Sequence, residues 1–241
     1  MTLNIGHRGF SGLYPENTML SFQKALEAGV DGFEFDTHLT KDGEIVVIHD
    51  EKIDRTTNGT GFVKDYTYEE LKQFDASSVF AGQYGFNYIP TLREYFELTK
   101  GMDLMTNIEL KNSIIWYDGM EEKVIAMIRE YGVEEQIVLS SFNHYSIMKC
   151  KKLAPELKCG FLDSSWLVNP GEYTKSRGVE CYHPSFRSLD EATVAEVHSH
   201  GIEINTWTVN ETEDIQRMFD LGVHSVITNF PDRVNAVKQG R

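Results

Sequence analysis

The sequence predicts an α/β fold of alternating strands and helices, most simply a (β/α)8 barrel. Its 241 residues suit one such barrel. Five amphipathic segments end in Gly followed by a β-branched residue, a pattern that marks the turn from a helix into the next strand: Gly29-Val30, Gly132-Val133, Gly178-Val179, Gly201-Ile202 and Gly222-Val223. Strands that alternate with helices pair in parallel through crossover connections. An open, doubly wound sheet is the alternative, because sequence does not reveal strand order.

Eight short apolar segments are the expected strands: 4–7, 32–36, 106–110, 137–141, 158–162, 180–183, 203–208 and 225–229. The intervening segments have helical periodicity. In residues 18–28, for example, Phe22, Ala25 and Leu26 share one face. Eight strand–helix units in about 240 residues match a TIM barrel.

Two features interrupt the alternation after the second strand. Residues 40–43 (Thr-Lys-Asp-Gly) predict a hairpin between 35–39 and 44–48. If Leu39 pairs with Glu44, then His49 lies opposite Glu34 on the same face of the sheet. Residues 50–90 are too long for an ordinary loop. We therefore expect a single barrel domain, residues 1–241, with 50–90 as a small insertion over the C-terminal face.

That insertion contains one clear helix signal. Thr67 and Glu70 form a capping-box pattern directly before Leu71 and Phe74. We therefore expect one short helix there.

Composition excludes several classes of protein. Hydrophobic residues make up 41% and charged residues 25%, which are ordinary globular values. The 37 acidic and 23 basic residues give a net charge of −14, and no Lys/Arg run is present, so we expect no nucleic-acid partner. A surplus of carboxylates suits a divalent cation instead.

Cysteine usage and hydropathy indicate the compartment. The three cysteines, Cys150, Cys159 and Cys181, have no metal-like spacing, which favours buried thiols in a reducing environment. No signal-like segment precedes His7, and the longest aliphatic run, residues 45–48, is far too short to span a membrane. We expect a cytoplasmic protein without stable membrane association.

Glu34 and Asp36 alternate with Phe33 and Phe35 in the second strand. Both carboxylates therefore point to one face and both phenyl rings to the other. Two acids on the inward face of a barrel strand are costly unless a cation holds them. A solvated edge strand is the alternative explanation.

Glu109 and Lys111 repeat this alternation on the next predicted strand. If the two strands are neighbours, Glu109 lies beside Glu34 and Asp36. Three carboxylates form a hard oxygen site suited to Mg²⁺ or Ca²⁺ rather than zinc. The alternative is a surface ion pair between Glu109 and Lys111.

Two of the eight histidines stand apart. His7 ends the first strand and precedes Arg8, and His49 ends the returning hairpin strand. Two imidazoles beside a divalent cation can act as a general acid–base pair. Arg8 and Lys111 can hold a phosphate. The combination favours hydrolysis of a phosphoryl ester.

These residues resemble the glycerophosphodiester phosphodiesterase family. The matching motifs run from Gly6 to Asp232: His7-Arg8-Gly9, Pro15-Glu16-Asn17-Thr18, Glu34-x-Asp36, Asp42-Gly43 leading to His49-Asp50, Ile108-Glu109-Leu110-Lys111 and Asn205-Thr206-Trp207-Thr208-Val209-Asn210. The resemblance implies a TIM barrel. It also implies metal-dependent hydrolysis of small glycerophosphodiesters, such as glycerophosphocholine or glycerophosphoethanolamine, to glycerol 3-phosphate and an alcohol.

The resemblance also implies a role for each residue. His7 and His49 would be the acid–base pair, and Glu34, Asp36 and Glu109 would bind one Ca²⁺ or Mg²⁺. Arg8 and Lys111 would hold the phosphate, and Trp207 and Phe142 would line the pocket. Glu16 would support the site. Asn17 would shape the turn after the first strand. Two departures from the family pattern, Thr37 and Asn229, are not expected to touch the carboxylates or the histidines.

Competing functions use a similar site. A lysophospholipase D-like or phosphoinositide-cleaving enzyme would share the barrel, although no basic patch or amphipathic membrane helix supports either. A non-catalytic metal- or phosphate-binding barrel would be expected to have lost one histidine, yet His7 and His49 are both present. A carbon-centred enzyme of the enolase type would place a lysine base where one of them stands.

Overall fold

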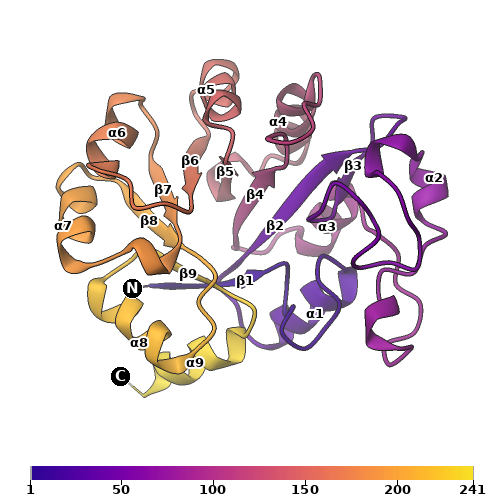
Figure 1. Ribbon diagram of the computed structural model, residues 1–241, viewed down its shortest axis with the longest axis horizontal. Helices are drawn as coiled ribbons and strands as arrows, with labels where there is room; N and C mark the ends of the chain where they lie inside the picture. The colour runs from indigo at the N-terminus through magenta and orange to yellow at the C-terminus, as the bar shows by residue number, and fades with distance from the viewer. Residues whose placement is uncertain (1, 241) are drawn as a thin grey trace.

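The computed structural model describes residues 2–240 and contains a closed barrel of eight parallel strands (Figure 1). The strands are β1 (Leu3–His7), β2 (Gly32–Leu39), β4 (Met105–Leu110), β5 (Ile137–Ser141), β6 (Lys158–Asp163), β7 (Cys181–Pro184), β8 (Glu203–Thr206) and β9 (Ser225–Thr228). They follow one another around the barrel, and β1 pairs with both β2 and β9. This closure confirms the TIM barrel and excludes the open sheet.

Helices surround the strands (Figure 1). They are α1 (Met19–Glu27), α3 (Leu92–Thr99), α4 (Met120–Tyr131), α5 (His144–Leu153), α6 (Pro170–Ser176), α7 (Glu191–Ser199), α8 (Thr212–Leu221) and α9 (Pro231–Gln239), with the short 3-10 helices η3 (Glu134–Gln136) and η4 (Phe186–Ser188). The predicted helix-ending glycines all have positive φ: Gly29, Gly132, Gly178, Gly201 and Gly222. Within residues 2–240, no helix is long and apolar enough to cross a bilayer.

The two faces of β2 have opposite chemistry. Phe33 and Phe35 point outward, where they contact Phe22 of α1 and Tyr95 of α3 with ring centroids 4.4–5.7 Å apart. All four rings are fully buried. Because side chains alternate along a strand, this packing directs the carboxylates of β2 into the barrel.

The hairpin strand β3 (Ile45–Val47) runs antiparallel to β2, as predicted, but in a different register. Leu39 pairs with Ile45 and Thr37 with Val47, so the predicted pairing of Leu39 with Glu44 is wrong by one residue. This slip does not turn His49 away from the barrel, because β3 ends at Val47. Beyond that point the backbone N–H of Ile48 donates to the carbonyl of Asp36 over 3.1 Å. The direction of the His49 side chain is therefore set by the turn after β3 and not by the register of the hairpin.

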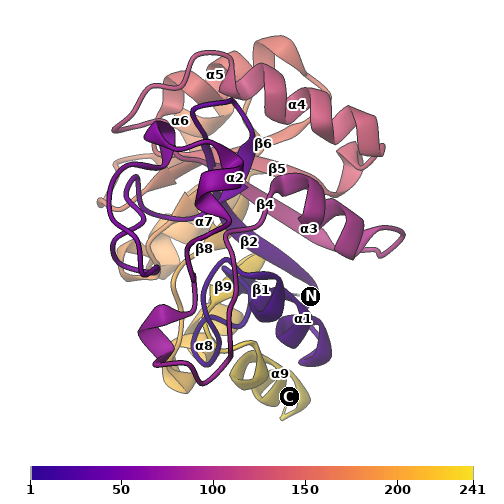
Figure 2. The ribbon, with the colours of Figure 1, turned by 90° about the vertical axis from the view of Figure 1, so that its right-hand side faces the viewer.

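Residues 50–90 contain η1 (Val63–Asp65), α2 (Tyr68–Leu71) and η2 (Ser78–Phe80). The Thr67–Glu70 capping box at the start of α2 is present as predicted. A small apolar cluster supports the segment: Val46, Ile48, Ile53, Val63, Leu71, Ala76 and Ile89. The segment lies beside the hairpin and α3 (Figure 2), and the Tyr84 hydroxyl joins it to the β1–α1 loop by donating to the carbonyl of Leu13 over 2.6 Å.

Polar side chains fill part of the barrel interior. The two ring nitrogens of His183 lie 3.4 Å from Asn107 Nδ2 and 3.1 Å from Asn205 Nδ2. All three side chains are buried. Burial lowers the pKa of His183 from its ordinary 6.5 to about 3, so the folded barrel holds this imidazole neutral.

We predict that His183 contributes to acid unfolding. Its pKa is lower in the folded chain than in the unfolded chain, so the unfolded chain binds the extra proton between pH 6.5 and about 3. The free energy of unfolding should fall with decreasing pH in this window, by at most about 1.4 kcal/mol per pH unit from this group. Urea unfolding of His183→Asn should show a shallower pH slope than wild type.

The matched control is His198→Asn, at an exposed position on α7. Its pH slope should match wild type. A slope in His183→Asn equal to that of wild type would contradict the prediction.

Candidate active site

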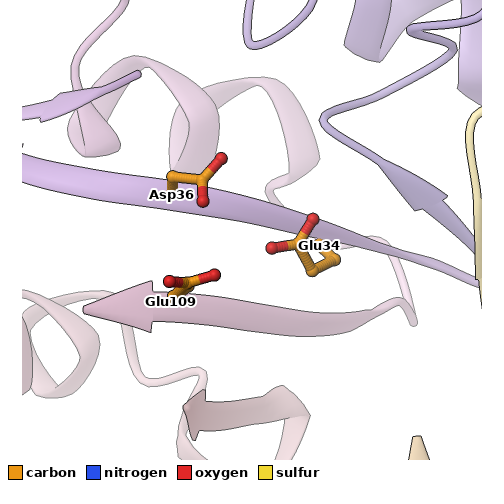
Figure 3. A group of neighbouring side chains, drawn as sticks. All are labelled: Glu34, Asp36 and Glu109. Carbon is orange, nitrogen blue, oxygen red and sulfur yellow. The ribbon is translucent and has the colours of Figure 1, made fainter. Parts of the chain in front are cut away.

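Three carboxylates converge inside the C-terminal end of the barrel (Figure 3). Strand β2 supplies Glu34 and Asp36, and β4 supplies Glu109 directly beside Asp36 in the parallel register. One oxygen of each lies within 4.8 Å of the others. The three residues are 5%, 0% and 6% exposed. The prediction that these two strands are neighbours is confirmed.

The electrostatics of this cluster favour the binding of a cation. Burial and the charge of Asp36 raise the pKa of Glu34 well above its ordinary value and that of Glu109 to about 7. Burial also acts to raise the pKa of Asp36, but neighbouring cations, above all Arg8, lower it instead. Glu34 Oε2 and Asp36 Oδ1 are buried and accept no hydrogen bond from the described residues, while Glu109 Oε1 has only Lys111 Nζ nearby, at 3.0 Å. Three convergent hard oxygens with so few hydrogen-bond donors fit a divalent metal ion.

His7 ends β1 with its Nε2 atom 3.6 Å from Glu34 Oε2. On the other side of the ring, Nδ1 lies 2.5 Å from Asn229 Oδ1. Burial, followed by the charge of Arg8, lowers the pKa of His7 to about 3. The imidazole is therefore neutral in the folded protein.

His49 lies on the opposite side of the cluster. Its Nε2 atom is 4.0 Å from Asp36 Oδ1 and 3.3 Å from Lys111 Nζ. Its Nδ1 atom is 2.6 Å from Asp50 Oδ1, which orients the ring. The two histidines thus flank the carboxylates, with one ring nitrogen of each facing inward.

Arg8 and Lys111 complete the charged part of the site. Arg8 Nε lies 3.2 Å from Asp36 Oδ2, and Arg8 Nη1 donates to Glu16 Oε1 over 3.0 Å. Lys111 Nζ lies 3.0 Å from Glu109 Oε1 and 3.9 Å from Asp36 Oδ1. Burial opposes the charge of both cations, but the carboxylates outweigh it and raise their pKa values. Both side chains therefore remain positively charged.

Both histidines, Arg8 and two of the three acids line a cavity of about 90 Å³. Its apolar wall includes Phe142 and Trp207, whose rings meet edge to face with centroids 5.6 Å apart. The remaining lining residues are His7, Arg8, Glu34, His49, Asn107, Glu109, Leu162, Thr208 and Ile227. A larger hollow of about 800 Å³, near the N-terminal ends of β8 and β9, has no comparable acidic cluster among its described lining residues.

Residues 50–90, the expected insertion over the C-terminal face, supply no wall of this cavity among the residues that the structure describes. Within the described chain, the cavity is lined by barrel strands and their loops, and none of its lining residues comes from 50–90. The segment instead lies against the β1–α1 loop, where Arg55 donates to Glu16. It borders the site from the side because its own apolar cluster holds it against the hairpin.

Asn229 and Asn17 contact the site in ways that sequence reasoning missed. Asn229 was expected not to touch a histidine, yet its Oδ1 atom lies 2.5 Å from His7 Nδ1, because β9 pairs with β1. Asn17 shapes the turn, as expected, with a φ of 56° and its backbone N–H donating to the carbonyl of Arg8. Its side chain also donates to Asp36 Oδ2 over 3.1 Å. The only sequence signals for these contacts were the position of Asn229 just beyond β9 and that of Asn17 in the loop between β1 and α1.

Thr37, the other departure from the family pattern, does not touch the acidic side chains. Its hydroxyl donates to the backbone carbonyl of Glu109 over 2.9 Å. The Thr37 side chain therefore links β2 to the backbone of β4.

Comparison with known proteins agrees with this geometry. Residues 7–233 match the model of the glycerophosphoryl diester phosphodiesterase family. A glycerophosphodiester phosphodiesterase of Caldanaerobacter subterraneus subsp. tengcongensis is 46% identical over 99% of both chains. One of Bacillus altitudinis is 44% identical, again over 99% of both chains.

Solved structures show the same architecture. A phosphodiesterase of Oleispira antarctica, in complex with the product sn-glycerol-3-phosphate, superposes with a TM-score of 0.87 at 29% identity, covering 98% of this chain and 96% of that one. A glycerophosphodiester phosphodiesterase of Agrobacterium tumefaciens gives 0.84 at 27% identity, covering 98% and 100%. The family match spans nearly the whole chain and includes every residue of the acidic cluster. The chain therefore belongs to the glycerophosphoryl diester phosphodiesterase family.

Proposed function

We propose that this chain hydrolyses glycerophosphodiesters, such as glycerophosphocholine and glycerophosphoethanolamine, to glycerol 3-phosphate and an alcohol. The observation that carries this function is one cavity lined by both histidines, Arg8 and two acids of the cluster, with Asp36 and Lys111 directly behind them, in a member of this family. A related phosphodiesterase that holds sn-glycerol-3-phosphate supports the product assignment.

We further propose that residues 1–241 act as one barrel domain, with residues 50–90 inserted in it. The three cysteines are buried and unpaired, which suits a reducing compartment, and the cytoplasm is the proposed location.

Glu34, Asp36 and Glu109 are the proposed ligands of one divalent cation, Ca²⁺ or Mg²⁺. Hard carboxylate oxygens are the ligands that both ions prefer. A cation bound there would polarise a phosphate oxygen and stabilise negative charge. Its positive charge would also offset the repulsion among the three acids.

Arg8 and Lys111 are the proposed phosphate-binding residues. Both project toward the acidic cluster from just beyond the ends of β1 and β4, the two strands that flank β2. Their N–H groups can donate to the non-bridging oxygens, where charge builds up in the transition state. Glu16 supports this role by accepting a hydrogen bond from Arg8.

His7 and His49 are the proposed acid–base pair. One removes a proton from the nucleophile, a water or the 2-hydroxyl of the substrate's glycerol, and the other protonates the departing alcohol oxygen. Each histidine has one ring nitrogen held by a neighbour, Asn229 or Asp50, and the other directed inward. Trp207 and Phe142 form the apolar wall beside them.

A second candidate activity is lysophospholipase D-like cleavage. Large apolar side chains are exposed on the loops after β4, β5 and β6 and on the first turn of α5, at the catalytic end of the barrel: Ile114, Trp116, Phe142, Tyr145, Trp166 and Val168. Phe142 also lines the cavity. An acyl chain on the substrate's glycerol could extend from the cavity over these side chains, whereas an anionic lipid surface would be repelled by the net charge of −14.

The metal assignment predicts the behaviour of Glu109→Gln. The variant keeps the side chain's shape but loses a charged ligand, so Mg²⁺ or Ca²⁺ should bind at least about 10-fold more weakly by calorimetry. Turnover should fall with it, and EDTA should abolish wild-type activity. The cation should raise the melting temperature of wild type, because it binds only the folded site, but not that of the variant.

The control is Glu130→Gln on α4, a surface carboxylate paired with Arg93. It should retain both cation binding and activity. Wild-type cation affinity in Glu109→Gln would remove Glu109 from the ligand set.

The acid–base assignment predicts that His7→Ala and His49→Ala each lose roughly 10²–10⁴-fold in kcat. Cation binding by calorimetry should survive in both, because neither imidazole is a proposed ligand. His198→Ala, at an exposed position on α7, serves as the control. Near-normal turnover in either active-site variant would refute its role.

The shape of the site predicts selectivity for glycerol on one side of the phosphate. Choline, ethanolamine and glycerol diesters of glycerol 3-phosphate should be cleaved with kcat/KM values within about a tenfold range, equivalent to roughly 1.4 kcal/mol. A 2-deoxyglycerol diester should be a poor substrate, because a site that hydrogen-bonds a hydroxyl rejects the analogue lacking it. Bis(p-nitrophenyl) phosphate should also be poor, despite its better leaving group.

One panel of substrates compares these values directly. If bis(p-nitrophenyl) phosphate exceeded glycerophosphocholine in kcat/KM, the glycerol selectivity would be wrong. If lysophosphatidylcholine exceeded it, the second candidate activity would replace the first.

A further inference from the structure

Arg55, in the segment 50–90, makes two carboxylate contacts at once. Its Nη1 and Nη2 atoms donate to the two oxygens of Glu16, each over 2.8 Å. Its Nε and Nη2 atoms donate to the two oxygens of Asp50 over 2.8 and 3.0 Å. Both edges of the planar guanidinium are therefore occupied by carboxylates, a geometry that lysine cannot reproduce.

Each of these carboxylates holds a different part of the proposed catalytic machinery. Glu16 accepts a hydrogen bond from Arg8, the proposed phosphate ligand, over 3.0 Å. Asp50 contacts Nδ1 of His49, a proposed acid–base residue, over 2.6 Å. Arg55 is thus one residue removed from both groups and touches neither directly.

The contacts form a closed circuit. From Asp36 it passes through Arg8 and Glu16 to Arg55, and returns through Asp50 and His49 to Asp36, with a final separation of 4.0 Å between His49 Nε2 and Asp36 Oδ1. Acidic and basic side chains alternate around this circuit. Loss of Arg55 would leave two neighbouring carboxylates without their shared cation, beside a site that must accept an anionic phosphate.

The backbone around Arg55 is well anchored. Ile53 is fully buried, its N–H donates to the carbonyl of Gly61, and its carbonyl accepts from the N–H of Thr57. The guanidinium therefore projects from a supported turn, although its side chain is 47% exposed. Exposed ion pairs contribute little to folding, so fold stability alone does not account for this arrangement.

We propose that Arg55 is a positioning residue for the phosphodiesterase reaction, which fixes Arg8 through Glu16 and His49 through Asp50. This inference rests on the proposed function and gives segment 50–90 a role in it: the segment supplies the cation that holds two catalytic groups in register. Displacements of about 1 Å in such groups can reduce turnover by up to roughly 10²-fold.

The two arms of the circuit have different kinetic signatures. Asp50→Asn should mainly lower kcat, because it disturbs His49, and Glu16→Gln should mainly raise KM, because it disturbs Arg8. Arg55→Gln should do both, with kcat reduced roughly 10- to 100-fold. Arg55→Lys should resemble Arg55→Gln, because it keeps the charge but loses the two-edged geometry.

Arg93→Gln is the matched control. Arg93 also makes two hydrogen bonds to one carboxylate, that of Glu130, and its side chain is 48% exposed, but it lies on α3 away from the cavity. Both Arg55→Gln and Arg93→Gln should keep melting temperatures within about 4 °C of wild type. Only the Arg55 variant should lose activity on glycerophosphocholine.

Chemical rescue separates positioning from a general loss of structure. Millimolar guanidinium should restore part of the kcat of Arg55→Ala, because the exposed gap admits it, whereas ammonium should not. Kinetic constants of Arg55→Gln within twofold of wild type, or full activity in Arg55→Lys, would overturn the proposal. Wild type inactive on glycerophosphocholine with added Mg²⁺ or Ca²⁺ would instead refute the proposed function itself.

Discussion

The mutual repulsion of three buried carboxylates is the constraint around which the catalytic end of this barrel is arranged. Glu34, Asp36 and Glu109 lie within 4.8 Å of one another at almost no solvent exposure. Such a cluster is tolerated only where positive charge surrounds it. Arg8 and Lys111 supply part of that charge, and a divalent cation suits the three convergent carboxylate oxygens.

The barrel scaffold supports this cluster from its outer side. Strand β2 can direct two acids inward because its alternate residues, Phe33 and Phe35, pack against α1 and α3. The register between β2 and β4 then sets Asp36 beside Glu109. The same backbone alternation therefore serves both the apolar packing and the chemistry, and neither can shift without the other.

Charge balance extends outward from the cluster to the rim. Arg8 and His49, which face the cluster, are each held from behind by a carboxylate, Glu16 or Asp50. Arg55 joins these carboxylates, so the loop after β1, the end of the hairpin and the segment 50–90 meet at one guanidinium. The segment contributes none of the cavity's described lining residues and meets the site through these rim contacts.

The sequence by itself determined the strand positions, the helix-ending glycines and the inward direction of Glu34 and Asp36. These features follow from local periodicity and from the conformational freedom of glycine. Only the tertiary structure decided the hairpin register, because a one-residue shift satisfies the same turn pattern. It also decided the contact of Asn229 with His7, two residues 222 positions apart in the chain that meet when β9 closes against β1. The role of Arg55 could not be predicted from the sequence for the same reason. Its partner Glu16 is 39 positions away in the chain. Ion pairs between such distant side chains depend on how the loops fold, which local sequence patterns do not encode.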